Sequence, residues 1–113
     1  DQQVAAPKTA DDVQVAPRAE ERVEHPRLWR VLLHNDDFTT QEFVVWVLES
    51  VFNLPPAEAF RVMMHVHQAG IGVAGLFTRD VAETKVKAAQ TLAEQHEFPL
   101  LVTLEPDPEG PRA

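Results

Sequence analysis

A strand-to-helix corner made of three polar residues most constrains the fold of this chain. Residues 32–44 read LLHNDDFTTQEFV, so an apolar segment ends near His34 and Asn35, Asp36 and Asp37 separate it from an amphipathic one. Asn and Asp are common in turns, because their side chains hydrogen-bond to nearby main-chain groups. A loop that presents acceptors from a rigid scaffold has the same composition. The pattern therefore fits both a plain turn and a binding loop.

The segment before this corner alternates imperfectly, whereas the one after it has a clear helical period. Residues 28–33 are rich in β-branched and aromatic side chains, which favours a strand. Thr39 and Glu42 have the T-x-x-E spacing of a capping box, which predicts the start of a helix. Trp46 points away from the apolar stripe and either packs under the N-terminal arm or belongs to a contact surface. The stripe itself consists of Phe43, Val44, Val47, Leu48, Val51 and Phe52.

A second helix follows a break at Pro55 and Pro56. Pro56 suits the first turn of a helix, and Gly70 is a natural C-terminal cap, so we expect this helix to extend to about Ala69. His65 and His67 lie about 200° apart around its axis and do not face each other. Its buried residues are expected to be Ala59, Val62, Met63 and Val66.

The remaining segments complete the order β-α-α-β-α-β. Small and apolar residues predict a strand at 71–77 and another at 100–104, with a third helix at about 79–96 between them. The buried stripe of this helix is expected at Val81, Ala82, Val86, Ala89, Leu92 and Ala93. This order predicts an α+β two-layer sandwich with the helices on one face of a three-stranded sheet. The connection through the third helix fits a parallel crossover, but the strand order stays open.

The two ends of the chain differ in composition from the predicted domain at 27–106. Residues 1–26 have no aromatic side chain and no sustained apolar period, so we expect a disordered extension. It is either a passive tail or a tether that a partner captures. Several prolines make the tail at 107–113 irregular.

Charge and composition narrow the class of partner. The formal net charge of −8 repels phosphate backbones, so we expect no nucleic-acid partner. No apolar run approaches the roughly 20 residues of a membrane span, so no membrane partner is expected either. The absence of cysteine excludes disulfides and thiolate metal sites and fits a reducing compartment. We expect a cytoplasmic monomer.

Catalytic chemistry has little support in these residues. The single serine, Ser50, lies on the outward face of the first helix, and adjacent carboxylates such as Asp36 and Asp37 seldom converge on one substrate. His34 and His67 would add nitrogen ligands to these carboxylates, but the local spacings match no specific metal motif. We therefore expect no enzyme, metal or cofactor, and a metal-dependent enzyme using these four residues remains a remote alternative.

Binding of a peptide's N-terminus accounts for the same residues better. If His67 lies beside the corner at 35–37, the two together offer hydrogen-bond acceptors and negative charge. An ammonium group has donors only, so it suits these acceptors. An apolar floor beside them would suit a bulky first side chain; its expected members are Leu33, Val44, Met63 and Val66. The rival interpretation is that these residues are only a core and a turn.

Four ordered segments resemble one known family. LLHNDDFTTQEFVVWVL, MMHVHQAGIGVAGLFT, VAETKV and FPLLVTLE are similar to segments of ClpS, the bacterial adaptor of the N-end rule, over about residues 27–105. The resemblance implies a three-stranded antiparallel sheet against three helices, similar to the C-terminal domain of the ribosomal stalk protein. It also implies an adaptor that binds proteins beginning with Leu, Phe, Tyr or Trp. The family delivers these N-degron substrates to the Hsp100 unfoldase ClpA of the ClpAP protease.

The resemblance also implies the roles of individual residues. The α-amino group would be bound by Asn35, Asp36, Asp37 and His67. The side-chain pocket would comprise Leu33, Thr39, Gln41, Val44, Met63, Val66 and Leu100. Asp80 and Lys85 would contact the N-domain of the unfoldase, and the N-terminal extension would take part in substrate delivery.

Gln41 is the main departure from the family pattern. The family usually has Met at this position as a gatekeeper that helps to exclude β-branched first residues, and Pro is common where Thr40 stands. Gln is similar in length but polar. We therefore expect a shifted or narrowed first-residue preference. The alternative is a non-catalytic module that docks on a Clp unfoldase with altered or no such preference.

Overall fold

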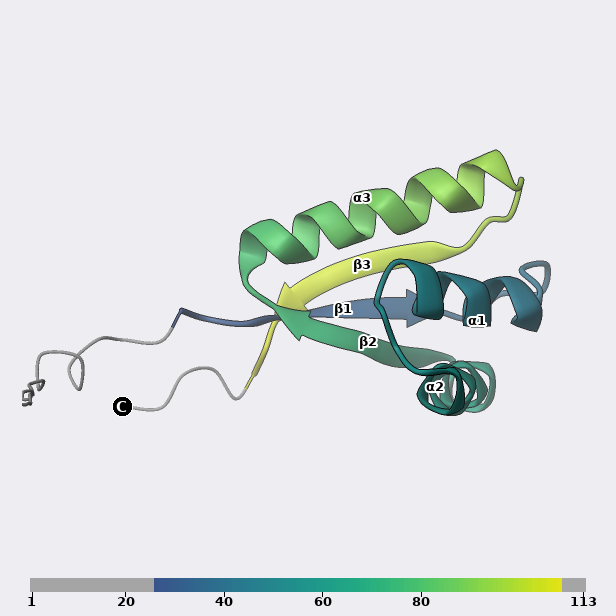
Figure 1. Ribbon diagram of the computed structural model, residues 1–113, viewed down its shortest axis with the longest axis horizontal. Helices are drawn as coiled ribbons and strands as arrows, with labels where there is room; N and C mark the ends of the chain where they lie inside the picture. Colours follow the sequence, from purple (N-terminus) through teal and green to yellow (C-terminus); the bar gives the residue numbers. More distant parts are fainter. Residues whose placement is uncertain (1–25, 109–113) are drawn as a thin grey trace, which may run out of the picture.

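The strand that ends at the polar corner is the central strand of the sheet. The computed structural model describes residues 26–108. In it β1 (Trp29–His34) lies between β2 (Ile71–Phe77) and β3 (Leu101–Pro106) and pairs antiparallel with both. Consequently β2 and β3 are parallel to each other, and α3 (Arg79–Gln95) forms the crossover that connects them (Figure 1). The predicted α+β fold with an antiparallel sheet is confirmed, and the order β2-β1-β3 answers the open question of strand arrangement.

The central strand, β1, is buried on both of its faces. Val31 and Leu33 are completely buried on the helical face, and Leu32 is also buried on the opposite face. The neighbouring strands bury one face only, because Ala74 and Val102 are buried while the other face is exposed. That open face carries Ile71, Val73, Leu76 and Leu101.

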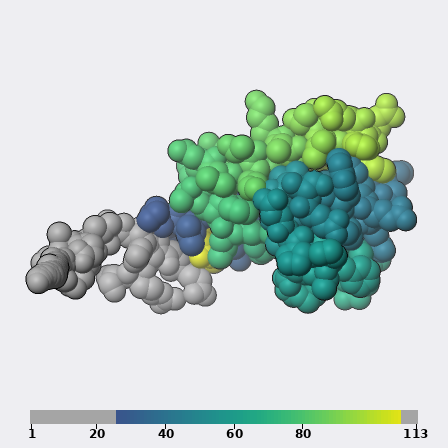
Figure 2. Space-filling view, viewed as in Figure 1, coloured from purple at the N-terminus to yellow at the C-terminus, as the bar shows by residue number. Residues whose placement is uncertain are grey.

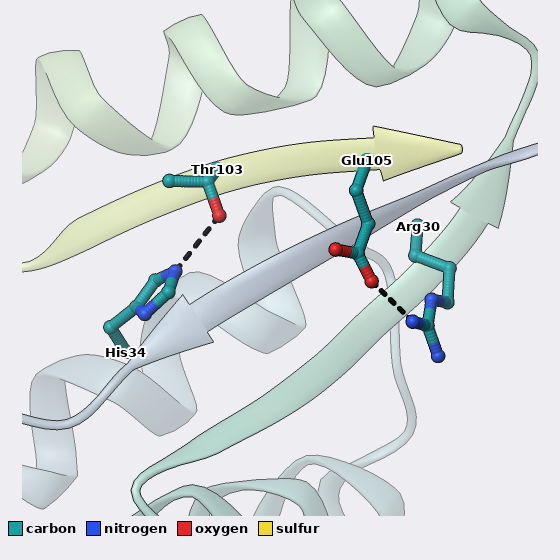
Figure 3. Close-up of polar contacts among 4 residues, drawn as sticks. All are labelled: Arg30, His34, Thr103 and Glu105. Carbon is teal, nitrogen blue, oxygen red and sulfur yellow. Dashed lines mark hydrogen bonds and ion pairs between the residues drawn. The ribbon is translucent and has the colours of Figure 1, made fainter. Parts of the chain in front are cut away.

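Two polar contacts tie β1 to β3 on the open face (Figure 3). Arg30 forms an ion pair with Glu105, its direct partner across the strands. The His34 Nε2 atom lies 2.8 Å from the Thr103 hydroxyl oxygen, at hydrogen-bond distance. Cross-strand pairs of this kind each contribute modestly, about 0.2–1 kcal/mol, so they support the strand register more than the overall stability.

The first helix, α1 (Gln41–Ser50), buries the predicted stripe. All of the expected core residues are buried, including Val51 and Phe52 just beyond the helix end. Trp46 is 41% exposed, and its ring centroid lies 5.7 Å from that of Phe43 and 5.4 Å from that of His96. The outward orientation of Trp46 is confirmed, and its ring packs near the rings of Phe43 and His96.

The capping-box prediction placed the helix start one residue too early. The Thr40 hydroxyl, not that of Thr39, accepts a hydrogen bond from the Phe43 N–H at 3.1 Å. Thr39 instead donates its main-chain N–H and its hydroxyl to Asp36. The local carboxylate takes both donors of Thr39, so the following threonine becomes the N-cap.

The second helix, α2 (Pro56–Ala69), agrees with its sequence pattern. Its buried residues are the four predicted ones, and Gly70 adopts the left-handed conformation with φ of 93°, which L-residues other than glycine rarely adopt. Pro56 occupies the first turn, where its missing N–H costs no helical hydrogen bond.

One predicted core residue of α3 is exposed. Val81 has 44% of its surface exposed, whereas Ala82, Ala89 and Ala93 are buried. These alanines lie within about 20° of one line along the helix, while Val81 lies about 100° from Ala82 around the axis. Because the alanine line faces the sheet, Val81 points sideways into solvent.

The pairing of β1 with β3 extends beyond the two strands at the ends of the domain. The Asp107 N–H donates to the Leu28 carbonyl at 2.8 Å, which continues the β1–β3 pairing by one step. Most of the predicted extension at 1–26 and of the tail at 107–113 lies outside the described residues, so the domain boundaries stay a prediction. Among residues 26–108, no helix is long and apolar enough to cross a membrane.

Candidate functional site

The polar corner lies against the C-terminal end of α2. The main-chain N–H of Asn35 donates a hydrogen bond to the carbonyl oxygen of Gly70 at 2.9 Å, and His34 pairs with Ile71 at the start of β2. His67 lies in the last turn of α2, three residues before Gly70. Two segments that are distant in sequence therefore meet at this corner.

Hydrogen bonds within the corner converge on Asp36. Its Oδ1 atom accepts the N–H groups of Phe38 and Thr39 at 2.8 and 2.7 Å, and its Oδ2 atom accepts the Thr39 hydroxyl at 2.7 Å. Burial raises the pKa of the Asp36 carboxyl, but the hydrogen bonds from Thr39 and Phe38 outweigh burial and lower it below the ordinary value of 3.8. Asp36 is therefore a structural part of this loop.

The other predicted amine-binding side chains are accessible. Asn35, Asp37 and His67 are exposed, whereas Asp36 is half-buried. The side-chain hydrogen bonds of residues 35–39 to other described residues all end on Asp36, which leaves the Asp37 carboxylate open to a ligand. The negative end of the α2 macrodipole adds to this field, because carbonyl groups at a helix C-terminus favour cations. The surroundings thus suit an ammonium group.

Most of the predicted pocket residues belong to the core behind the corner. Leu33, Val44 and Val66 are buried, as are Met63 and Leu100, and Thr39 is half-buried in the loop. The five buried residues form an apolar floor, but they expose little surface to a ligand. Gln41 differs from them, because it is exposed at the first position of α1.

An open groove of about 290 Å³ lies between α1 and α2 and contains two of the predicted residues. Gln41 and Met63 line it together with Glu42, Val45 and Phe60. In Figure 2 these helices form the adjoining teal surfaces near the centre and lower edge of the molecule. The sequence analysis gave none of these last three residues a role in binding. Phe60 offered a signal, since it is an aromatic residue outside the buried stripe of α2 and is 57% exposed.

The two residues predicted to contact an unfoldase lie far from the corner. β2 begins beside the corner at Ile71 and ends at Phe77, and α3 starts at Arg79, so Asp80 lies roughly 20 Å away along the strand direction (Figure 1). Asp80 is exposed. Lys85 is half-buried, and its ammonium nitrogen donates to the Val51 carbonyl oxygen at 2.6 Å. Only Asp80 is fully available to a partner.

The remote metal-site alternative lacks the required geometry. Within residues 26–108, no three His, Cys, Asp or Glu side chains converge to form a ligand group. His34 lies on the open face of the sheet beside Thr103, and Asp36 already holds the loop. The four residues named for this alternative therefore do not form a metal-binding cluster.

Comparison with known proteins connects this geometry to a family. Residues 24–103 match the sequence profile of the ATP-dependent Clp protease adaptor protein ClpS, which is more than half of the chain. The chain belongs to the ClpS family. Its members are adaptor proteins of the Clp protease, so the expectation of a non-catalytic protein is confirmed, and Clp protease components are its class of partner.

Several relatives carry the same description. The ClpS adapter of Desulfatibacillum aliphaticivorans is 51% identical over 87 residues, which cover 77% of this chain and 84% of the relative. The ClpS adapter of Rhodospirillum centenum is 50% identical over 93 residues, which cover 82% of this chain and 86% of the relative. Both alignments span most of the ClpS domain.

A solved structure also has the ClpS fold. Agrobacterium tumefaciens ClpS2 bound to L-phenylalaninamide matches with a TM-score of 0.71 and 44% sequence identity, and the match covers 74% of this chain and all of that one. The predicted fold class is thus confirmed by a relative. The ligand of that relative has a free amino group and an aromatic side chain.

Proposed function

We propose that this protein recognises the free amino group and bulky hydrophobic side chain of a protein's first residue. Its substrates would begin with Leu, Phe, Tyr or Trp, and it would deliver them to a ClpA-type unfoldase of the ClpAP protease. The observation that carries this proposal is the hydrogen bond from Asn35 to Gly70, which joins the acidic corner to the helix end that bears His67. The phenylalaninamide complex of a 44% identical relative supports it, because that ligand resembles the first residue of a peptide.

The amino group would enter the corner made by Asn35, Asp36, Asp37 and His67. These side chains supply carbonyl, carboxylate and imidazole acceptors, and an ammonium group offers three donors. A charge-assisted hydrogen bond contributes about 1.5–3 kcal/mol. Acetylation removes both the charge and most of these donors, so a blocked N-terminus should bind far more weakly.

The first side chain would pack beside the apolar floor at Met63 and Val66. Burying one large apolar side chain contributes about 1.5–3 kcal/mol, and association removes several kcal/mol. Together with the charged contacts, this points to roughly micromolar affinity, or about 8 kcal/mol. Because Val66 and Met63 are nearly fully buried, some rearrangement near Gln41 would accompany binding.

Gln41 supports a second candidate for the specificity of the site. It is exposed at the start of α1 and lines the groove with Met63, so its amide can contact a first side chain. A polar amide at this position makes an apolar contact less favourable. The alternative function is accordingly an adaptor that docks on the unfoldase with an altered first-residue preference or none.

Delivery would use the other end of the domain. Asp80 and Lys85 lie near the start of α3, and their separation from the corner would allow substrate and unfoldase to bind at the same time. The proposed role of residues 1–26 in delivery concerns a segment that, apart from residue 26, lies outside the described residues. An adaptor of this kind would act with its protease in the cytoplasm.

Peptide binding followed by fluorescence anisotropy tests the proposal. A labelled peptide that begins with Phe or Leu should bind, and its N-acetylated form should lose at least about tenfold in affinity. His67→Ala should weaken binding of the free peptide while the fold stays intact, because His67 is exposed.

His65→Ala is the matched control, since His65 is also exposed on α2 but lies about 200° around the axis from His67. Equal binding of the free and acetylated peptides would show that the proposed amine site is wrong. A purely structural module would bind neither peptide.

A further inference from the structure

Phe60 and His67 lie on one line along the exposed face of α2. Their spacing of seven residues places them within about 20° of each other around the helix axis and roughly 10 Å apart along it. Both side chains are exposed. The helix therefore presents an aromatic ring on the same face as His67, farther from the polar corner.

The groove between α1 and α2 leads away from this corner. Gln41 and Met63, two members of the predicted first-residue pocket, line the groove of about 290 Å³. Val45 lies one turn after Gln41 on α1, and Phe60 lies one turn before Met63 on α2. Since α1 starts and α2 ends at the corner, both residues extend the lining in the direction away from it.

An extended peptide has the length to reach this groove. Three residues span about 10 Å, which is roughly the separation of His67 and Phe60 along α2. Successive side chains of an extended chain point to opposite sides, so the third side chain points to the same side as the first. A peptide whose amino group lies at His67 would therefore direct its third side chain into the groove beside Phe60.

The lining of the groove favours a long side chain with a positive end. Val45, Phe60 and Met63 are apolar, and Glu42 is the one charged residue among the five that line the groove. Glu42 is exposed in the first turn of α1. The stem of an arginine would pack on the apolar residues, while its guanidinium group would pair with the Glu42 carboxylate and stack on the Phe60 ring. An acidic side chain would be repelled.

We propose that this groove binds the side chain of the substrate's third residue and prefers arginine at that position. The inference rests on the proposed recognition of a free N-terminus and adds a second point of selection to it. Phe60 and Glu42 are the residues that determine this preference. The adaptor would thereby distinguish between proteins that have the same first residue.

Peptides that begin with Phe-Ala-Xaa and differ only in Xaa test the preference by fluorescence anisotropy. Xaa is arginine, citrulline, alanine or glutamate, and citrulline has the shape of arginine without its charge. The arginine peptide should bind about two- to fivefold more tightly than the citrulline peptide, as expected for an exposed ion pair. The citrulline peptide should bind about threefold more tightly than the alanine peptide through packing of its stem. The glutamate peptide should bind most weakly.

Two variants separate the contributions of charge and packing. Glu42→Gln should remove the advantage of arginine over citrulline, and Phe60→Ala should remove the advantage of citrulline over alanine. Both replaced side chains are exposed, so the fold should be retained. Leu76→Ala is the matched control and should keep both ratios, since Leu76 is an exposed apolar residue on the open face of the sheet. Arginine placed at the second position should bind without dependence on Phe60.

The inference is overturned if the four peptides bind the parent protein equally, or if both affinity ratios persist in Glu42→Gln and Phe60→Ala. It is also overturned if Phe60→Ala only dissociates a dimer of this chain, seen by sedimentation, and leaves the ratios unchanged. The groove would then be a contact between two copies.

Failure of the proposed function has a different signature. In that case the parent protein would bind the Phe-Ala-Ala peptide and its N-acetylated form equally, and the groove inference would be overturned with it. If acetylation weakens binding but the third residue makes no difference, the inference about the groove alone is wrong.

Discussion

The ammonium nitrogen of Lys85 donates a hydrogen bond of 2.6 Å to the carbonyl oxygen of Val51, 34 positions away in the sequence. Val51 is the C-cap of α1, where carbonyl groups lack partners within the helix. A positive charge there also interacts favourably with the helix macrodipole. Lys85 therefore joins α3 to the end of α1, besides any role in contacting an unfoldase.

Replacing this lysine should destabilise the domain. Lys85→Met keeps the apolar stem but removes the donor and the charge, so we expect a loss of about 1 kcal/mol in the free energy of unfolding, measured by urea denaturation. Lys87→Met is the matched control, because Lys87 is exposed on the same helix. A defect in unfoldase binding should then be assessed with Asp80→Ala, since Asp80 is exposed and its loss removes only a favourable charge in the first turn of α3, worth about 0.3–1 kcal/mol. Equal stability of the two lysine variants would argue against this bond.

Gln41→Met should change the order of preference among first residues. Met at the start of α1 would present an apolar side chain to the groove, so affinity for Leu- and Phe-starting peptides should rise relative to peptides with polar or small first residues. The measurement is a series of peptides that differ only in residue one, assayed against both proteins. An unchanged ranking would exclude Gln41 as a determinant of specificity. Glu42→Gln is a useful control, because Glu42 lines the same groove from the next position.

Gly72→Ala should weaken the contact between β2 and α2. A Cβ atom at Gly72 would lie 2.7 Å from the Val66 Cγ2 atom and 3.3 Å from the His65 Cδ2 atom, so the helix or the strand must shift. Overpacking of this kind typically costs about 1–3 kcal/mol, measurable as a lower midpoint of urea unfolding. Peptide affinity should fall as well, because Val66 precedes His67. Val73→Ala is the control on the exposed face of the same strand and should have a small effect.

Asp36 should make the stability of the domain sensitive to acid. Its pKa in the folded protein lies below the ordinary value of 3.8, so its carboxylate contributes stability that is present above that value. This contribution is lost as the pH falls through the folded-state pKa. Asp36→Asn should therefore lose less stability than the parent protein between pH 6 and about pH 3, as measured by urea unfolding at each pH. Asp37→Asn should follow the parent protein, since Asp37 accepts none of the loop's hydrogen bonds. A parallel loss in all three proteins would contradict this role for Asp36.

Local sequence patterns correctly predicted those structural features that depend only on residues close together in the chain. The stripes of α1 and α2 follow from helical spacing, and Gly70 ends α2 because glycine readily adopts positive φ. The T-x-x-E spacing predicted Thr39 as the N-cap of α1, but Thr40, which has the same hydroxyl group, takes this position. The Asp36 carboxylate resolved that choice by accepting both donors of Thr39.

Three features were decided by tertiary contacts. Val81 is exposed because the alanine line of α3, rather than its bulkier residues, faces the sheet. Lys85 caps a helix that ends far away in the sequence. The groove beside Gln41 exists because α1 and α2 pack side by side and leave Phe60 outside the core.

The sequence by itself determined the order of the elements, the buried stripes of the first two helices and the polar residues of the corner, because hydrophobic period and turn chemistry act over a few residues. Only the tertiary structure decided which strand is central and that the corner meets the C-terminal end of α2 through Asn35 and Gly70. It also decided the different surroundings of Asp36 and Asp37. These outcomes depend on hydrogen bonds and packing that no local pattern encodes, since they form only when distant segments share one core.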